Sequence, residues 1–163
     1  MKNISVIGSG TMGNGIAQTF ALFNFKVRLY DINSEILKKG EQTILKNLQR
    51  MVNKEKINES EAENTVGNIK YTSDFDSILN ADLVIEVVSE NFKLKKSIFK
   101  ELDLKCPKNT IIASNTSSIS ITKLAEATTR KDKVIGMHFM NPVPIMKLVE
   151  VINSKYTSKE TTC

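Results

Sequence analysis

Long apolar runs are missing from this sequence of 163 residues. No segment approaches the roughly 20 consecutive apolar residues that a membrane span requires. The chain opens with the strand-like run Ile4–Ile7, and not with the charged and apolar regions of a signal peptide. These absences exclude a membrane-spanning helix. They predict a soluble, cytoplasmic protein without a membrane partner.

Cysteine and histidine are also scarce. The two cysteines, Cys106 and Cys163, lie far apart, and neither belongs to a CxxC pair or to a cluster of metal-ligand residues. His138 is the only histidine. The sequence therefore predicts no metal site, and it favours a reducing compartment.

Tryptophan is absent, and aromatic residues make up only 6% of the chain. The formal net charge of +5 would suit nucleic acid, but the lysines are dispersed and no nucleic-acid-binding motif is present. An anionic small molecule fits this charge better as a partner.

What is present is an ordinary globular composition, with 40% hydrophobic and 25% charged residues, at a length typical of one main domain. The patterns predict a strand over 3–8, a helix over 12–24 and a strand over 26–31, which together make a mononucleotide-binding unit. The apolar side of that helix is expected to comprise Met12, Ile16, Phe20 and Phe23.

Residues 34 to about 67 carry a long, charged helical pattern, which Asn58-Glu59-Ser60 interrupts, so we expect a helical hairpin there. Strands and helices alternate afterwards, which predicts a Rossmann-type α/β fold: a doubly wound, mostly parallel sheet with the hairpin as an insertion. The further strands are expected at 69–72, 82–88, 110–114, 133–138 and 147–152, and the further helices at 92–105 and 120–128.

A GxGxxG sequence, Gly8 to Gly13, lies between the first strand and the first helix. Gly8 permits the tight turn, Gly10 lets the backbone approach a pyrophosphate, and Gly13 allows close packing of helix on strand. The free N–H groups at the start of the helix, those of Thr11 and Met12 among them, would meet the phosphates. A tight turn alone is the alternative, and the flanking strand and helix argue against it.

Asp31 ends the second strand about 20 residues later, where the ribose-binding acid of this fingerprint belongs. Its carboxylate would accept hydrogen bonds from ribose hydroxyls and would repel a 2′-phosphate. We therefore expect NAD as the cofactor in preference to NADP, although Arg28 nearby leaves NADP open.

His138 lies at the carboxyl end of a predicted strand, the edge of such a sheet where ligands bind. Glu150 follows the turn at Asn141–Pro144, so an adjacent strand would bring its carboxylate to the imidazole. A packed or surface histidine and an exposed strand carboxylate are the alternatives.

The tail contains Thr157-Ser158-Lys159-Glu160, a match to the capping box that opens a helix, with three residues after it. We expect from this a chain cut short at a helix start; the alternative is a frayed polar tail.

Three stretches carry a specific resemblance: ASNTSS at 113–118, GMHFMNPVP at 136–144 and MKLVEV at 146–151. They resemble the L-3-hydroxyacyl-CoA dehydrogenases, especially the short-chain bacterial 3-hydroxybutyryl-CoA branch, and the similarity extends over the whole chain. The GMHFMNP run argues against the 3-hydroxyisobutyrate and 6-phosphogluconate dehydrogenases, which share the glycine motif but rely on a catalytic lysine.

The resemblance implies that His138 takes the proton from the substrate 3-hydroxyl while a hydride passes to nicotinamide, and that Glu150 fixes the imidazole tautomer. It places Ser117 and Asn141 around the reacting oxygen or the cofactor, and Asn115 at the nicotinamide end. Without the family, these three are turn-forming polar residues.

The resemblance also places Glu90 and Lys95 near the cofactor; without the family, both are solvated surface charges. It implies that the hairpin, about 34–68, covers the coenzyme A end of the substrate. Asn47, Arg50 and Lys54 share one helical face there and would meet adenine and phosphate groups, with a solvated basic face as the alternative.

Family members continue into a helical second domain that completes the substrate pocket and forms a homodimer. We therefore expect an NAD-binding domain over 1–153 and the start of a connection over 154–163. Two functions stay open: an NAD-dependent dehydrogenase of short-chain 3-hydroxyacyl-CoA in fatty acid or butyrate metabolism, impaired in this form, or a non-catalytic NAD-binding module.

Overall fold

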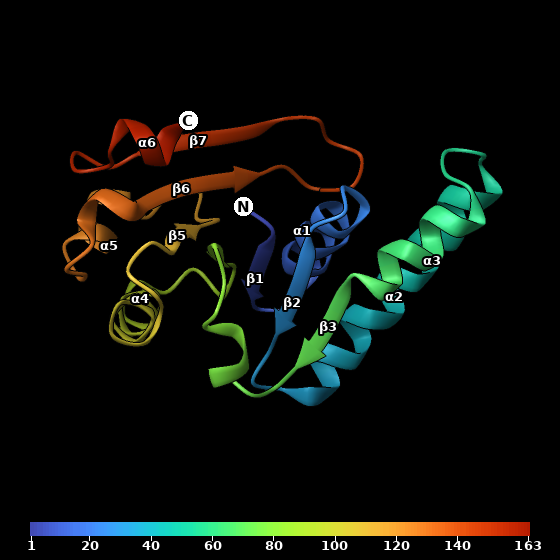
Figure 1. Cartoon of the computed structure of the whole chain (residues 1–163), viewed down its shortest axis with the longest axis horizontal. Helices are drawn as coiled ribbons and strands as arrows, with labels where there is room; N and C mark the ends of the chain where they lie inside the picture. The colour runs from blue at the N-terminus through green and yellow to red at the C-terminus, as the bar shows by residue number, and fades with distance from the viewer.

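A seven-stranded sheet with the order β3-β2-β1-β4-β5-β6-β7 runs through the molecule (Figure 1). The computed structural model describes residues 1–163. Neighbouring strands are parallel except for β6 and β7, which pair antiparallel. The strands are β1 (Asn3–Ile7), β2 (Lys26–Tyr30), β3 (Ile69–Thr72), β4 (Leu83–Glu86), β5 (Ile111–Ser114), β6 (Val134–Phe139) and β7 (Val149–Asn153).

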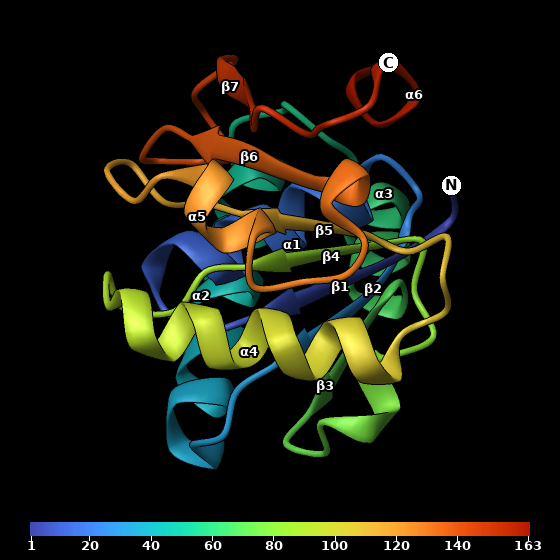
Figure 2. The same cartoon turned by 90° about the vertical axis from the view of Figure 1, so that its left-hand side faces the viewer.

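Helices cover both faces of this sheet, so the predicted doubly wound α/β fold is confirmed. The helices are α1 (Thr11–Leu22), α2 (Ser34–Asn53), α3 (Glu59–Gly67), α4 (Phe92–Lys105), α5 (Ile121–Ala125) and α6 (Lys159–Thr162), with short 3₁₀ turns η1 (Asp76–Ile78) and η2 (Lys131–Lys133). Figure 2 shows α4 and α5 in front of the strands, with α1 and α2 behind them.

Two apolar cores result from the alternation of side chains along the strands. Val6 and Ile85 belong to the core beneath α1, α2 and α3, whereas Ile7 and Val84 belong to the core beneath α4 and α5. Burial on both faces explains why these strands are apolar throughout.

The hairpin has the predicted form. Asn33 caps α2 by accepting hydrogen bonds from the backbone N–H groups of Glu35 and Ile36. Asn58 and Glu61 form a reciprocal capping box at the start of α3. In Figure 1 the two helices lie along one side of the sheet, and the turn between them reaches away from the strands.

Two sequence expectations are wrong. Phe23 follows the last residue of α1 and is 71% exposed, because Ala17 and Ala21 supply the buried side of that helix. The N-cap of α6 is Ser158 and not Thr157, because the Thr157 hydroxyl donates instead to the carbonyl of Val134 and ties the tail to β6.

None of the helices combines the length and the apolar character that a membrane crossing requires.

Candidate functional site

The glycine-rich turn between β1 and α1 uses each of its three glycines differently. Gly8 has φ +103°, a conformation that favours glycine. A Cβ on Gly13 would lie 1.7 Å from the carbonyl oxygen of Gly8, so only glycine lets α1 approach the strand. A Cβ on Gly10 would meet nothing within 4 Å, which leaves open space where a ligand can approach the backbone.

The N-terminus of α1 is free to bind an anion. Its N-cap, Gly10, provides no side-chain hydrogen bond, whereas Asn or Ser caps α2 to α6. Gly10, Thr11 and Met12 line a cavity of about 480 Å³ beside this helix end. Uncapped N–H groups and the positive end of the helix dipole suit the pyrophosphate of a dinucleotide.

A second hollow, of about 660 Å³, adjoins this cavity and shares Gly10 and the loop after β4 with it. Asp31 lies in its wall, where one carboxylate oxygen accepts from the backbone N–H of Ser9 at 2.8 Å and the other from that of Asn33 at 3.0 Å. These bonds fix the carboxylate at the end of β2, as a ribose-binding acid requires.

Sequence reasoning missed the apolar wall of this second hollow. Ile36 and Leu94 line it from α2 and α4, and Ile32 lies beside Asp31 while remaining 85% exposed. Apolar side chains next to Asp31 suit an adenine ring. Ile36 belongs to α2 and is 41% exposed, so part of the apolar side of this helix faces the hollow.

Arg28 is not part of either hollow. Its guanidinium bonds the carbonyl oxygen of Asn80 at 3.4 Å and lines a separate hollow at the amino ends of the strands. Arg28 therefore does not lie where it could bind the 2′-phosphate of NADP, and the geometry gives no reason to prefer NADP.

His138 and Glu150 face each other across the antiparallel pair β6 and β7, where they are direct partners in the register. The imidazole Nδ1 lies 2.8 Å from a carboxylate oxygen of Glu150. The histidine side chain is 24% exposed and the glutamate 53%, so the pair is reachable from solvent and linked at the same time.

The 480 Å³ cavity brings the histidine together with the other polar residues that the sequence singled out. It is lined by Glu90, Lys95, Asn115, Ser117, His138 and Asn141, besides the start of α1. Asn115 also accepts a hydrogen bond from the backbone N–H of Phe139 at 2.8 Å, which joins the ends of β5 and β6. The carboxyl ends of the strands thus meet at one site.

Lys95 is not the solvated surface charge that the sequence without the family suggests, because its side chain is only 1% exposed. Its ammonium donates to Glu86 at 2.8 Å and to the carbonyl of Val88 at 3.1 Å, and lies 3.4 Å from a carboxylate oxygen of Glu90. Glu86, which sequence reasoning missed, is fully buried. The sequence did not indicate this role for Glu86, because a single acidic residue in a strand is not distinctive and its partner Lys95 lies in the next helix.

Glu90 connects this buried pair to the cavity. Its carboxylate accepts from the hydroxyls of Thr116 and Ser118. Burial alone would raise the pKa of Glu90, but these hydrogen bonds and the charge of Lys95 outweigh it and lower the pKa below its ordinary value. The group therefore stays ionised beside the cavity.

Asn47, Arg50 and Lys54 line one hollow of about 240 Å³ between the hairpin and the Pro142–Pro144 loop. Asn47 donates to the side-chain oxygen of Gln18 at 3.3 Å. No acidic residue lines the hollow, and Lys56 adds a third cation to it. The expectation that these residues share one face is confirmed.

Comparison with protein families matches residues 3–163 to the model described as 3-hydroxyacyl-CoA dehydrogenase, NAD binding domain. A probable 3-hydroxybutyryl-CoA dehydrogenase of Bacillus subtilis is 48% identical over 99% of this chain and 56% of its own length. The mitochondrial hydroxyacyl-coenzyme A dehydrogenase of Homo sapiens is 43% identical over 99% of this chain and 53% of its own length.

Solved structures show the same likeness. The crystal structure of (S)-3-hydroxybutyryl-CoA dehydrogenase from Ralstonia eutropha superposes with a TM-score of 0.96 at 45% identity, over 99% of this chain and 57% of that one. The chain spans about half the length of the curated relatives that it matches.

Proposed function

Because the chain belongs to the 3-hydroxyacyl-CoA dehydrogenase family, through the NAD-binding domain of that family, we propose that it takes part in hydride transfer between NAD and a short-chain 3-hydroxyacyl-CoA. The observation that carries the proposal is the pair His138 and Glu150, 2.8 Å apart, at the cavity that the free N-terminus of α1 also lines.

The cofactor would occupy the two adjoining hollows. Gly8 and Gly13 shape the turn, and the backbone at Gly10, Thr11 and Met12 would bind the pyrophosphate. Asp31 would accept hydrogen bonds from the ribose, and the nicotinamide would lie among Glu90, Lys95 and Asn115. When bound, NAD supplies the carbon that accepts or gives the hydride.

His138 would act as the general base and acid. With Glu150 ionised, the imidazole N–H at Nδ1 donates to the carboxylate, so the lone pair at Nε2 is left to take the proton of the 3-hydroxyl. The adjacent carboxylate favours the imidazolium that forms. In the reductive direction Nε2 returns the same proton.

Ser117 and Asn141 would hold the reacting oxygen, because both line the cavity with His138. Asn47, Arg50 and Lys54 would bind the adenine and phosphates of coenzyme A, which suits the absence of acids from that hollow.

NADH oxidation by acetoacetyl-CoA tests the proposal, with the loss of NADH absorbance as the measurement. We expect His138→Ala to reduce the rate by about a hundredfold or more and Glu150→Gln by less. Glu63→Gln is the control, since Glu63 is exposed on α3 and lines neither the cofactor hollows nor the hollow at Asn47. Unchanged turnover in His138→Ala would overturn the base assignment.

The alternative function is a non-catalytic NAD-binding module. It would be favoured if the chain bound NADH but did not oxidise it, even after the helical domain of a relative had been supplied. Four further statements stay predictions: the division into 1–153 and 154–163, the homodimer, the cytoplasmic location and a role in butyrate metabolism. Some relatives are named as mitochondrial or peroxisomal.

A further inference from the structure

A hollow of about 340 Å³ lies at the amino ends of β1, β2 and β3, at the opposite edge of the sheet from the cofactor hollows. Lys26, Arg28 and Lys70 line it together with the amides Asn3 and Asn68, and no acidic residue does. Nothing in the proposed dehydrogenase chemistry uses this place.

The register of the sheet puts the three cations on one face. Lys26 and Arg28 are two residues apart on β2, so their side chains point the same way. Arg28 is the direct partner of Lys70 on β3, and Lys26 is the direct partner of Asn3 on β1. Like charges directly opposite one another in neighbouring strands destabilise a sheet, so this arrangement favours a bound anion.

No carboxylate in the protein neutralises these cations. All eight ion pairs within 4.0 Å involve other residues. Asp82, at the neighbouring strand β4, accepts instead from the backbone N–H groups of Lys2 and Asn3, at 2.6 and 2.9 Å. The charged side chains of the hollow therefore have no ion-pair partner in the protein.

Hydrogen-bond donors are also left over. The Lys26 ammonium donates to the side-chain oxygen of Asn68 at 2.7 Å and keeps two further N–H groups. Arg28 makes one long bond, to the carbonyl of Asn80 at 3.4 Å, out of five possible donors. The Lys70 side chain is exposed, and its ammonium has no hydrogen-bond or ion-pair partner in the protein.

We propose that this hollow binds the phosphate group of a small phosphorylated anion. The planar guanidinium of Arg28 offers two parallel donors to the phosphate oxygens, and Lys26 on β2 and Lys70 on β3 add point charges. The volume of about 340 Å³ leaves room beside a phosphate group for part of the attached molecule. The site is independent of NAD binding.

Titration of ¹⁵N-labelled protein, saturated with NADH to fill the cofactor hollows, tests this proposal by amide chemical shifts. Inorganic phosphate and glycerol 3-phosphate are the two probes, and tighter binding of the second identifies a phosphomonoester as the ligand. We expect saturable shifts at Asn3, Arg28, Asn68 and Lys70, with the turn at Gly10 unaffected.

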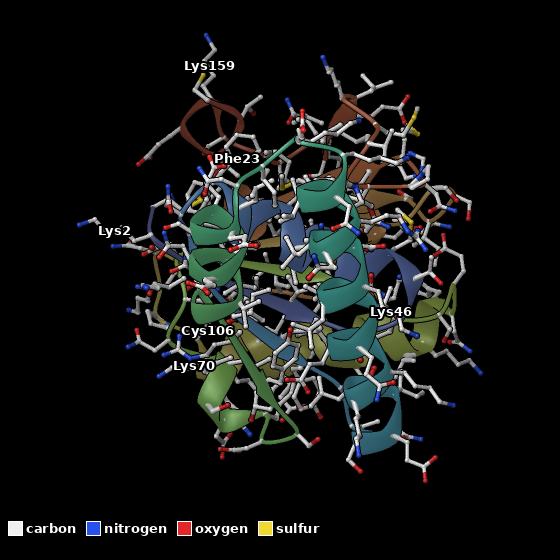
Figure 3. The ribbon with its side chains drawn as sticks, turned by 90° about the vertical axis from the view of Figure 1, so that its right-hand side faces the viewer. Lys2, Phe23, Lys46, Lys70, Cys106 and Lys159 are labelled. Carbon is white, nitrogen blue, oxygen red and sulfur yellow. The ribbon has the colours of Figure 1, made fainter.

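Two variants and a matched control distinguish a specific anion site from nonspecific electrostatic attraction of the probe to a positively charged protein. Arg28→Gln and Lys70→Gln each remove one charge and are expected to weaken binding about tenfold or more. Lys46→Gln removes the same charge elsewhere; in Figure 3 Lys2 and Lys70 lie on one side of the molecule and Lys46 on the other. The absence of saturable shifts in the hollow, or equal weakening by all three variants, would overturn the proposal.

Discussion

Glu86 and Lys95 show how single residues shape the wall of the 480 Å³ cavity, where we place the nicotinamide end of the cofactor. One carboxylate oxygen of Glu86 accepts from the Lys95 ammonium and from the backbone N–H of Val88, at 2.8 and 2.7 Å, and the other accepts from the Ser114 hydroxyl at 2.7 Å. This buried carboxylate therefore holds β5, α4 and the loop after β4, which lines both cofactor hollows.

Glu86→Gln is predicted to lower the free energy of unfolding by about 3 kcal/mol, because it leaves the Lys95 charge buried with only the partly exposed Glu90 nearby. Urea denaturation measures the change. Glu101→Gln makes the same substitution in an exposed pair with Lys105 and should change stability by less than about 1 kcal/mol. Equal losses in both variants would contradict a special role for the buried pair.

Among the secondary-structure elements, α1 is the one whose start is shaped for a ligand. The prediction concerns two of its glycines, which differ in what a methyl group would meet. Gly13→Ala should prevent native packing of α1, because the new Cβ would collide with the Gly8 carbonyl. Gly10→Ala should lower stability by no more than about 1 kcal/mol, because its Cβ enters open space and only the N-cap preference for glycine over alanine is lost.

Gly10→Ala should nonetheless weaken NADH binding, since that space is where we place the pyrophosphate. Thermal unfolding and fluorescence titration with NADH measure the two effects. Gly67→Ala is the control, because a Cβ there also meets nothing. If Gly10→Ala bound NADH as tightly as the parent, the placement of the pyrophosphate at this turn would be wrong.

Most elements could be predicted from the sequence because their signals are local. The helix 92–105 and the strand 69–72 have the predicted bounds, and the glycine turn, Asp31 and His138 lie where the fingerprint and the family motifs put them. The burial of Lys95 and the apolar wall at Ile36 depend on which elements pack together. Thr157 misled the capping-box reading because its hydroxyl has a partner 23 residues earlier, in β6.

The link between α4 and the segment before β6 should make stability depend on pH. Asp103 is 7% exposed and accepts from Arg130 Nε at 2.9 Å and from the backbone N–H of Thr129 at 2.7 Å. Burial alone would raise the pKa of Asp103, but these hydrogen bonds and the arginine charge lower it below the ordinary value.

A lowered pKa in the folded state stabilises the fold above the unfolded pKa of about 3.9, and the stabilisation is lost as the pH falls through the folded value. We therefore predict that the parent exceeds Asp103→Asn in unfolding free energy at neutral pH and that the gap narrows below about pH 4. Urea denaturation across that range measures it. A gap that does not change with pH would contradict the assignment.

At the scale of the whole molecule, the two proposed sites lie at opposite edges of the sheet. The carboxyl ends of β1, β2, β4, β5 and β6 surround the cofactor hollows and the pair of His138 and Glu150, while the amino ends of β1 to β3 form the cationic hollow. Two hollows that no acidic residue lines, the one at Asn47 and the one at Arg28, are each lined by three cationic side chains, which suits anions.

Fluorescence titration of the whole chain with NADH and NADPH tests most directly whether the two adjoining hollows hold NAD. Asp31 is fixed at the end of β2 by Ser9 and Asn33, and Arg28 points elsewhere, so a 2′-phosphate would meet an uncompensated carboxylate. We predict saturable NADH binding and NADPH binding at least about tenfold weaker. Absent NADH binding, or equal affinity for the two cofactors, would contradict this account.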